Sequence, residues 1–230
     1  MRVRLFIVHL GVIISVMIMG SLSSCKEDEA VPEISVKDLD GNTYTTIKIG
    51  TQVWTVENLK VTKYRNGDPI PNITDDEAWG NLTSGAYCNL GNDPNQAAVY
   101  GRLYNWAAVN DPRQLAPLGW HVPTDDEWTT LIAYLGGEAV AGGKMKETGS
   151  GHWCSPNVGA TNESGFTAVP AGVRSWEYGF LMGCDWGLLW SATEAEPTTA
   201  YHRFLFSDDA GINRVDNNKK SGMSVRCIKD

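Results

Sequence analysis

The sequence lacks the short motifs that commonly mark an enzyme active site. It has no Gly-x-Ser-x-Gly nucleophile elbow, no His-Glu-x-x-His helix and no glycine loop that could cradle a phosphate. His121 stands between Trp120 and Val122, where a packed, hydrogen-bonded role is a better explanation than that of a base. His152 and His202 have no metal-ligand spacing. We therefore expect no catalytic residue, no metal and no cofactor.

Calcium-binding patterns are also missing. Asp208, Asp209 and Asp216 do not have the spacing of an EF-hand loop, and they favour an acidic surface hairpin instead. Residues 196–198, Glu-Pro-Thr, match only part of the Glu-Pro-Asn found in sugar-binding C-type lectins. The absent Asn removes a calcium ligand, so calcium-dependent sugar binding is not expected.

Basic residues are scarce. The chain has 19 Lys and Arg against 27 Asp and Glu, which gives a net charge of -8. Residues 1–24 contain two Arg and no acidic residue, so the remainder has 17 basic and 27 acidic residues and a charge of -10. Such an acidic chain is a poor partner for nucleic acid.

The apolar run near the N-terminus is too short to span a bilayer. It extends from Leu5 to Met19, roughly fifteen residues where a spanning helix needs about 20. Because it follows Arg2 and Arg4 and ends in small residues, it is typical of a secretory signal. Residues 22–25, Leu-Ser-Ser-Cys, resemble the lipobox of bacterial lipoproteins, although a chance cysteine after an ordinary signal is the alternative. We expect residues 1–24 to be removed and Cys25 to carry the lipid that binds the bilayer.

The segment after the expected lipidation site is strongly charged. Residues 26–29, Lys-Glu-Asp-Glu, resemble the acidic export tag of surface lipoproteins in the Bacteroidetes, although any solvated tether would have a similar composition. We expect residues 25–34 to form a lipidated tether and residues 35–230 to form one domain. The expected location is the outer membrane, on the cell surface.

Four cysteines remain beyond Cys25, namely Cys88, Cys154, Cys184 and Cys227. In an exported protein an even number permits two disulfides, and four cysteines allow three pairings that the sequence does not rank. Free buried thiols are an equal alternative.

Hydrophobic patterning predicts short strands and three helices. The strongest local signal is Thr124 to Glu127, a capping box, followed by Trp128, Leu131, Ile132 and Leu135 at helical spacing and by two glycines. A second short helix is predicted over 138–146 and another helix over 100–109. Strands are predicted over 36–39, 44–49, 52–56, 166–169, 188–191, 201–206 and 224–228, with a loop from 63 to 94.

Several separated motifs occur in the order found in one known family. Residues 119–128, Gly-Trp-His-Val-Pro-Thr-Asp-Asp-Glu-Trp, together with residues 100–106, 162–166, 190–194 and 224–227, resemble the Fibrobacter succinogenes major paralogous domain. That family occurs on exported proteins of Bacteroidetes and Fibrobacteres, and its biochemical function is not established. Many relatives have a Cys shortly before the Gly-Trp-His motif, where this chain has Ala116 to Leu118. If that Cys pairs with the C-terminal one, Cys227 lacks its usual partner here.

The entry to the predicted helix also resembles a motif of the formylglycine-generating enzyme family, an elaborated C-type-lectin-like fold. The resemblance implies an α+β single domain with two helices, short antiparallel strands, long loops on one side, and first and last strands close together. The oxidases of that family use a close cysteine pair, whereas Cys184 and Cys227 are far apart in sequence. Their activity is therefore not expected here.

A glycine-rich, aromatic stretch from 172 to 190 offers the most promising binding surface. Trp176, Tyr178 and Trp186 lie in a segment too irregular to bury every ring, and exposed aromatics on loops stack on sugars or anchor partner chains. Core packing is an even alternative for Trp176 and Trp186. We expect a noncatalytic module that binds a glycan or protein; the alternatives are an enzyme on the same scaffold and a structural component of a surface appendage or complex.

Overall fold

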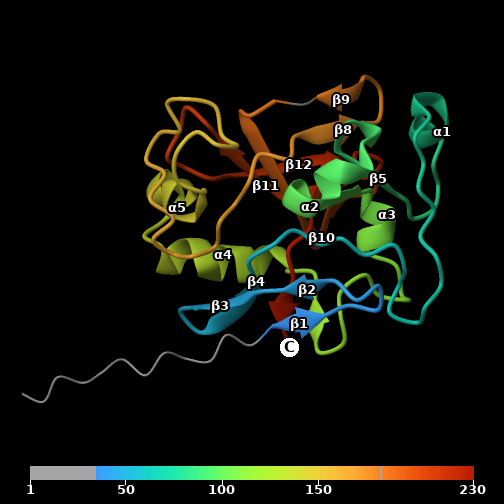
Figure 1. The fold of residues 1–230 in the computed structure, drawn as a ribbon, viewed down its shortest axis with the longest axis horizontal. Coiled ribbons are helices and arrows are strands. Elements are labelled where there is room, and N and C mark those ends of the chain that lie inside the picture. The colour runs from blue at the N-terminus through green and yellow to red at the C-terminus, as the bar shows by residue number, and fades with distance from the viewer. Residues whose placement is uncertain (1–34, 182) are drawn as a thin grey trace, which may run out of the picture. The chain divides into compact units, whose positions relative to one another are not determined.

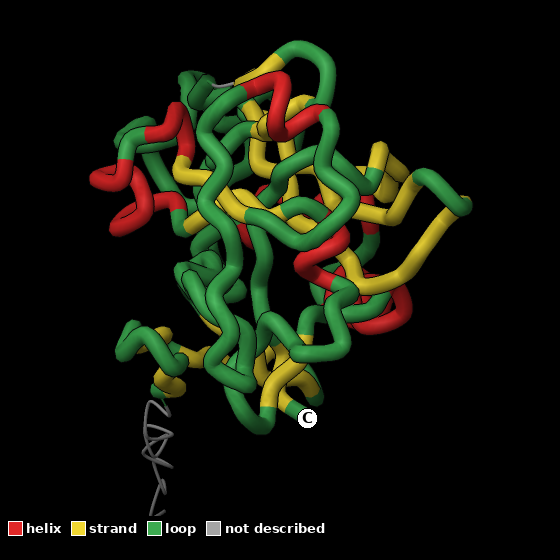
Figure 2. The backbone as a smooth tube through the Cα atoms, turned by 90° about the vertical axis from the view of Figure 1, so that its right-hand side faces the viewer, coloured by secondary structure: helices red, strands yellow, loops and turns green. Residues whose placement is uncertain are grey.

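An α+β architecture with several small antiparallel sheets is visible in this computed structural model, which describes residues 35–181 and 183–230 (Figure 1). The predicted signal peptide, lipidated Cys25 and tether up to residue 34 lie outside the described residues. No helix in the described part of the chain is long and apolar enough to span a bilayer. The tube in Figure 2 shows that loops connect most of these elements.

A four-stranded sheet joins the two ends of the domain. Its order is β3 (Thr46–Ile49), β4 (Gln52–Thr55), β13 (Ile228–Lys229) and β7 (Trp120–His121), all antiparallel. A separate hairpin of β1 (Val36–Lys37) and β2 (Thr43–Tyr44) precedes it. The predicted series of N-terminal hairpins is confirmed. The last strand, β13, lies between β4 and β7, whereas the first described strand, β1, pairs with β2.

A three-stranded sheet carries the longest strands. It consists of β10 (Trp186–Glu196), β11 (Thr199–Phe206) and β12 (Asn213–Asn218), and it confirms strands at 188–191 and 201–206. Beside it lies the hairpin of β8 (Val173–Ser175) and β9 (Gly179–Leu181). The turn between β11 and β12 contains Asp208 and Asp209, which agrees with the expected acidic hairpin.

The two predicted helices after residue 124 are confirmed as α4 (Asp125–Tyr134) and α5 (Glu138–Met145). Thr124 and Glu127 form both hydrogen bonds of the capping box. The apolar stripe of α4 is buried, and the Trp128 ring packs 4.8 Å from that of Trp54. The helix therefore forms where its local signals predict, and its apolar face joins the core.

The predicted helix over 100–109 is wrong. In its place are α2 (Ala97–Tyr100), β6 (Arg102–Tyr104) and α3 (Trp106–Val109). Gly101 separates α2 from β6 with a φ of 71°, and a Cβ there would lie 2.6 Å from the Cβ of Asn58. The positive φ ends the helix, and pairing with β5 (Tyr87–Asn89) makes the next residues a strand.

The stretch from 63 to 94 is also more ordered than predicted. It contains α1 (Asp76–Gly80), β5 and the 3₁₀ helix η1 (Leu90–Asn92), and the next such helix, η2 (Pro94–Gln96), begins at its end. Asp75 begins α1 because its carboxylate accepts the Ala78 N–H at 2.8 Å. Strands at 166–169 and over most of 224–228 are not formed, since Ala168 and Ser224 make only isolated bridges.

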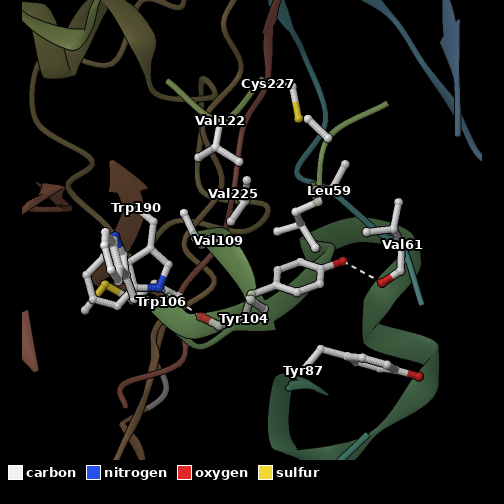
Figure 3. Packing of buried hydrophobic residues seen from close by; sticks show 14 of the residues in the cluster. Leu59, Val61, Tyr87, Tyr104, Trp106, Val109, Val122, Trp190, Val225 and Cys227 are labelled. Atoms are coloured by element: carbon white, nitrogen blue, oxygen red, sulfur yellow. Dashed lines mark hydrogen bonds between the residues drawn. The ribbon is translucent and has the colours of Figure 1, made fainter. Parts of the chain in front are cut away.

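Aromatic side chains fill the core between the two larger sheets. Figure 3 shows Trp106 and Trp190 packed near Tyr104, with Val225 and Cys227 on the last segment of the chain. The indole N–H of Trp190 donates to the Tyr104 carbonyl at 2.8 Å, and the Tyr104 hydroxyl donates to the Val61 carbonyl at 2.8 Å. Each buried ring thereby satisfies its polar atom while excluding water.

Buried cations hold the long loops. The ammonium of Lys146 donates to the carbonyls of Val158, Phe206 and Asp209 at 2.8 to 2.9 Å. The Arg226 guanidinium donates to the carbonyls of Thr55, Phe166 and Thr167, and that of Arg174 to the carbonyls of Ile73 and Thr74. Backbone groups that form no sheet ladder are satisfied in this way, which explains how so much irregular chain can be buried.

The four cysteines in the described part of the chain form one disulfide and two free thiols. Cys154 and Cys184 are bonded, whereas Cys88 and Cys227 are free and buried. Burial raises the pKa of the Cys88 thiol to about 11, and burial likewise raises that of Cys227. Both thiols stay protonated at neutral pH, so neither is a poised nucleophile.

Candidate ligand-binding groove

The three aromatic candidates lie at two places on the surface. Trp176 and Tyr178 occupy the turn between β8 and β9 and are 36% and 76% exposed, whereas Trp186 begins β10 and is 37% exposed. The Lys220 ammonium lies 6.0 Å from the Trp176 ring, and the Phe204 ring lies edge-on to Trp186 at 5.7 Å. Within the described residues no ring contact joins Trp176 to Trp186.

Trp186 stands in the wall of a groove of about 440 Å³, which we call the Trp186 groove. Trp186 and Phe206 are direct partners across β10 and β11, and Phe206 stacks on Phe204 at 3.9 Å. The wall formed by Trp186 and Phe206 is therefore aromatic, and strand pairing holds both residues in place. Its lining consists of Ser155, Pro156, Gly183, Asp185, Trp186, Phe206, Ser207 and Asp208.

The polar side of the groove is built around Asp185. The Ser207 hydroxyl donates to Oδ1 of Asp185 at 2.8 Å, and the Ser207 amide donates to the Asp185 carbonyl at 2.9 Å. Asp208 lines the same space and is exposed. Hydroxyl and carboxylate groups beside an aromatic ring are suited to hydrogen-bonding the edge of a ligand whose face stacks on the ring.

The disulfide joins the two chain segments that supply Ser155 and Asp185. Cys154 and Cys184 immediately precede Ser155 and Asp185, and the Cys154 amide also donates to the Cys184 carbonyl at 2.8 Å. On the third side, Lys146 binds the Phe206 and Asp209 carbonyls. Three segments distant in sequence are thus locked together around the groove, which reduces the ordering cost of binding.

A larger cavity of about 550 Å³ lies elsewhere, beside Trp106 at the start of α3. Only 5% of Trp106 is exposed, and its N–H donates to the Ser191 carbonyl at 2.9 Å. Lys219 lies over the ring at 4.7 Å and pairs with Glu194 at 3.0 Å. Little of this indole is free for a ligand, so the cavity offers a weaker stacking surface than the Trp186 groove.

Metal-ligating side chains converge at one place within the described chain, Cys154, Cys184 and Asp185. The two sulfurs form the disulfide there, which leaves a single carboxylate as a ligand. Asp208, Asp209 and Asp216 do not gather into such a group among the described residues. His152 pairs instead with Glu147 at 2.7 Å, and His202 is buried.

A comparison with protein families identifies the domain. The profile of the Fibrobacter succinogenes major domain matches residues 47–229. The chain belongs to this family. A search of curated proteins and a search of solved structures each find no significant match.

In this Fibrobacter succinogenes major domain, the motif around His121 builds the scaffold. His121 bonds to Asp230 Oδ1 through Nδ1 at 2.7 Å and to Glu127 Oε1 through Nε2 at 2.8 Å. Burial alone would lower the pKa of His121, but its hydrogen bonds to the two carboxylates outweigh burial and raise the pKa. A histidine bonded to two carboxylates links Glu127 in the first turn of α4 to Asp230, which directly follows the last strand, as expected for a packed, hydrogen-bonded residue.

The neighbouring Asp125 does the same for the other sheet. Its carboxylate contacts Arg203 and Arg214 at 2.8 Å each. Its backbone N–H donates to the Thr193 hydroxyl at 2.9 Å. The motif therefore connects α4 to both sheets. The Trp186 groove is lined instead by residues from 155–156, 183–186 and 206–208, and of these the sequence analysis predicts only Trp186 as a binding residue. Cys154 and Cys184, each followed directly by a groove residue, were the signal that could have located the rest.

Proposed function

We propose that this protein is a noncatalytic binding module that recognises a glycan through the Trp186 groove. The observation that carries the proposal is a half-buried indole in a rigid groove with Asp185 and Asp208 beside it. Pyranose rings stack on such indoles, while their hydroxyl groups hydrogen-bond to carboxylates. An aromatic anchor of this kind commonly supplies a large share of the affinity of a site.

The proposal includes a C-type-lectin-like fold and a lipid anchor. Small antiparallel sheets, two principal helices and long loops support the fold assignment. The sequence around Cys25 supports acylation and location on the outer membrane, facing outward. β1, the first described strand, lies at the opposite end of the body from β8 and β9, which precede the groove (Figure 1).

The direct test is binding of a soluble form that begins at residue 26, and so lacks the lipidated Cys25, to a glycan array. Trp186→Ala should abolish most binding, and Trp176→Ala is a matched control because the two indoles are almost equally exposed. Both variants should melt close to the unchanged protein, with losses of no more than about 1 kcal/mol for partly exposed side chains. Binding by Trp186→Ala equal to that of the control would contradict the proposal.

Location is tested separately. Protease added to intact cells should remove the domain if it faces outward. Complete protection of the domain, with digestion after the outer membrane is permeabilised, would place it in the periplasm.

A further inference from the structure

We propose that the Trp186 groove selects a positively charged amino sugar over neutral and acidic sugars. This inference rests on the proposed function and names the ligand class for the same site. Its basis is the charge of the lining: Asp185 and Asp208 are both carboxylates, and among the described residues no Lys, Arg or His lines the groove.

The nearby cation does not face the ligand space. Lys146 is fully buried behind the wall, and its ammonium is occupied by the carbonyls of Val158, Phe206 and Asp209. It moderates the negative potential but offers no hydrogen bond to a ligand in the groove. An acidic sugar would therefore bring its carboxylate next to two others without a partner, which is repulsive.

The geometry gives an ammonium group two favourable partners. Ser207 engages Oδ1 of Asp185, which leaves Oδ2 of this exposed carboxylate for a ligand. A cation that approaches the face of Trp186 is also attracted by the ring, an interaction effective within about 6 Å of its centre. A sugar that stacks on the indole and carries an amine on its edge can use both contacts at once.

The cavity beside Trp106 provides an internal contrast. Lys219 and Lys220 line it, and the only acid in its lining is Asp111, which Arg113 pairs at 2.8 Å. The two cavities of the described chain that we compare thus have opposite charge. A preference for amines should be a property of the Trp186 groove and not of the protein surface in general.

The experiment compares three oligosaccharides of equal length by calorimetry: a glucosamine tetramer, its N-acetylated counterpart and a uronic acid tetramer. At slightly acidic pH, where the amine carries its proton, the glucosamine tetramer should bind about two- to thirtyfold more tightly than the N-acetylated one, as expected for two exposed charge pairs. The uronic acid tetramer should bind weakest. Added salt should reduce the difference.

Variants distinguish the charge effect from stacking. Asp185→Asn combined with Asp208→Asn should remove the preference while N-acetylated binding persists, and Asp216→Asn, an exposed acid on β12, should leave the preference intact. Equal affinity of the unchanged protein for the charged and N-acetylated sugars, with both still dependent on Trp186, would overturn this inference and leave the proposed function standing. Tighter binding of a lysine-rich peptide than of any sugar would overturn both.

Discussion

His202 gives the sharpest prediction about stability. Its side chain is 1% exposed on β11, between the rings of Trp190 at 5.9 Å and Phe204 at 6.1 Å. Burial lowers the pKa of His202 from its ordinary value of 6.5 to about 4, with Asp216 opposing the shift and Arg203 adding to it. The folded protein therefore holds this imidazole neutral at neutral pH.

The pH dependence follows from the direction of the shift. Between pH 6.5 and about 4 the unfolded chain binds a proton at His202 that the folded chain does not. Stability is then fully present above the unfolded pKa and is lost as the pH falls toward the folded pKa. The whole difference corresponds to about 3 kcal/mol, of which about 2 kcal/mol is lost between about pH 7.5 and about pH 5.

Denaturant unfolding at those two pH values measures the effect. His202→Phe keeps a ring of similar size, removes the titration and should lose about 2 kcal/mol less than the unchanged protein between about pH 7.5 and about pH 5. His121→Gln is the control of opposite sign: the raised pKa of His121 contributes stability at low pH that is lost as the pH rises through it, so this variant should lose more on acidification. If His202→Phe and the unchanged protein lose stability equally, the buried neutral imidazole is not the cause.

Two further predictions concern α4 and the anchor. Trp128→Ala should cost about 3 to 5 kcal/mol because it leaves a cavity in the core, and Thr124→Ala about 1 kcal/mol through the lost N-cap; an unchanged melting temperature for Trp128→Ala would contradict the docking of α4. Cys25→Ala should abolish labelling by an azido fatty acid in growing cells, and label retained on that variant would contradict lipidation at this residue.

Local signals explain which elements could be predicted. The capping box at Thr124 and the stripe through Trp128 are contained within one helix, and α4 forms where they indicate. The prediction of a helix over 100–109 is wrong because the structure there depends on distant residues: β6 forms by pairing with β5. A periodic pattern cannot show that a distant strand will capture the same residues.

The candidate site likewise contains residues that local sequence predicts and residues that only distant contacts bring together. Trp186 was recognised because exposed aromatic residues in a glycine-rich stretch have a composition that can be read locally. Ser155 and Asp208 cannot be assigned to it from the sequence, because contacts between distant segments, among them the disulfide at Cys184 and the carbonyl contacts of Lys146, bring them to the groove. Neither contact leaves a periodic trace in the sequence.

The way the loops are anchored bears on how such a site can change. Lys146 and Arg226 hold loops through backbone carbonyls, and every residue type supplies a carbonyl. A side chain in these loops can therefore be replaced without removing the contact that positions the loop, whereas loss of either cation would leave several buried carbonyls without a partner. The fold thus separates the residues that place the Trp186 groove from those that line it. Substitutions at Asp185 or Asp208 should alter which sugar is bound while the groove itself persists.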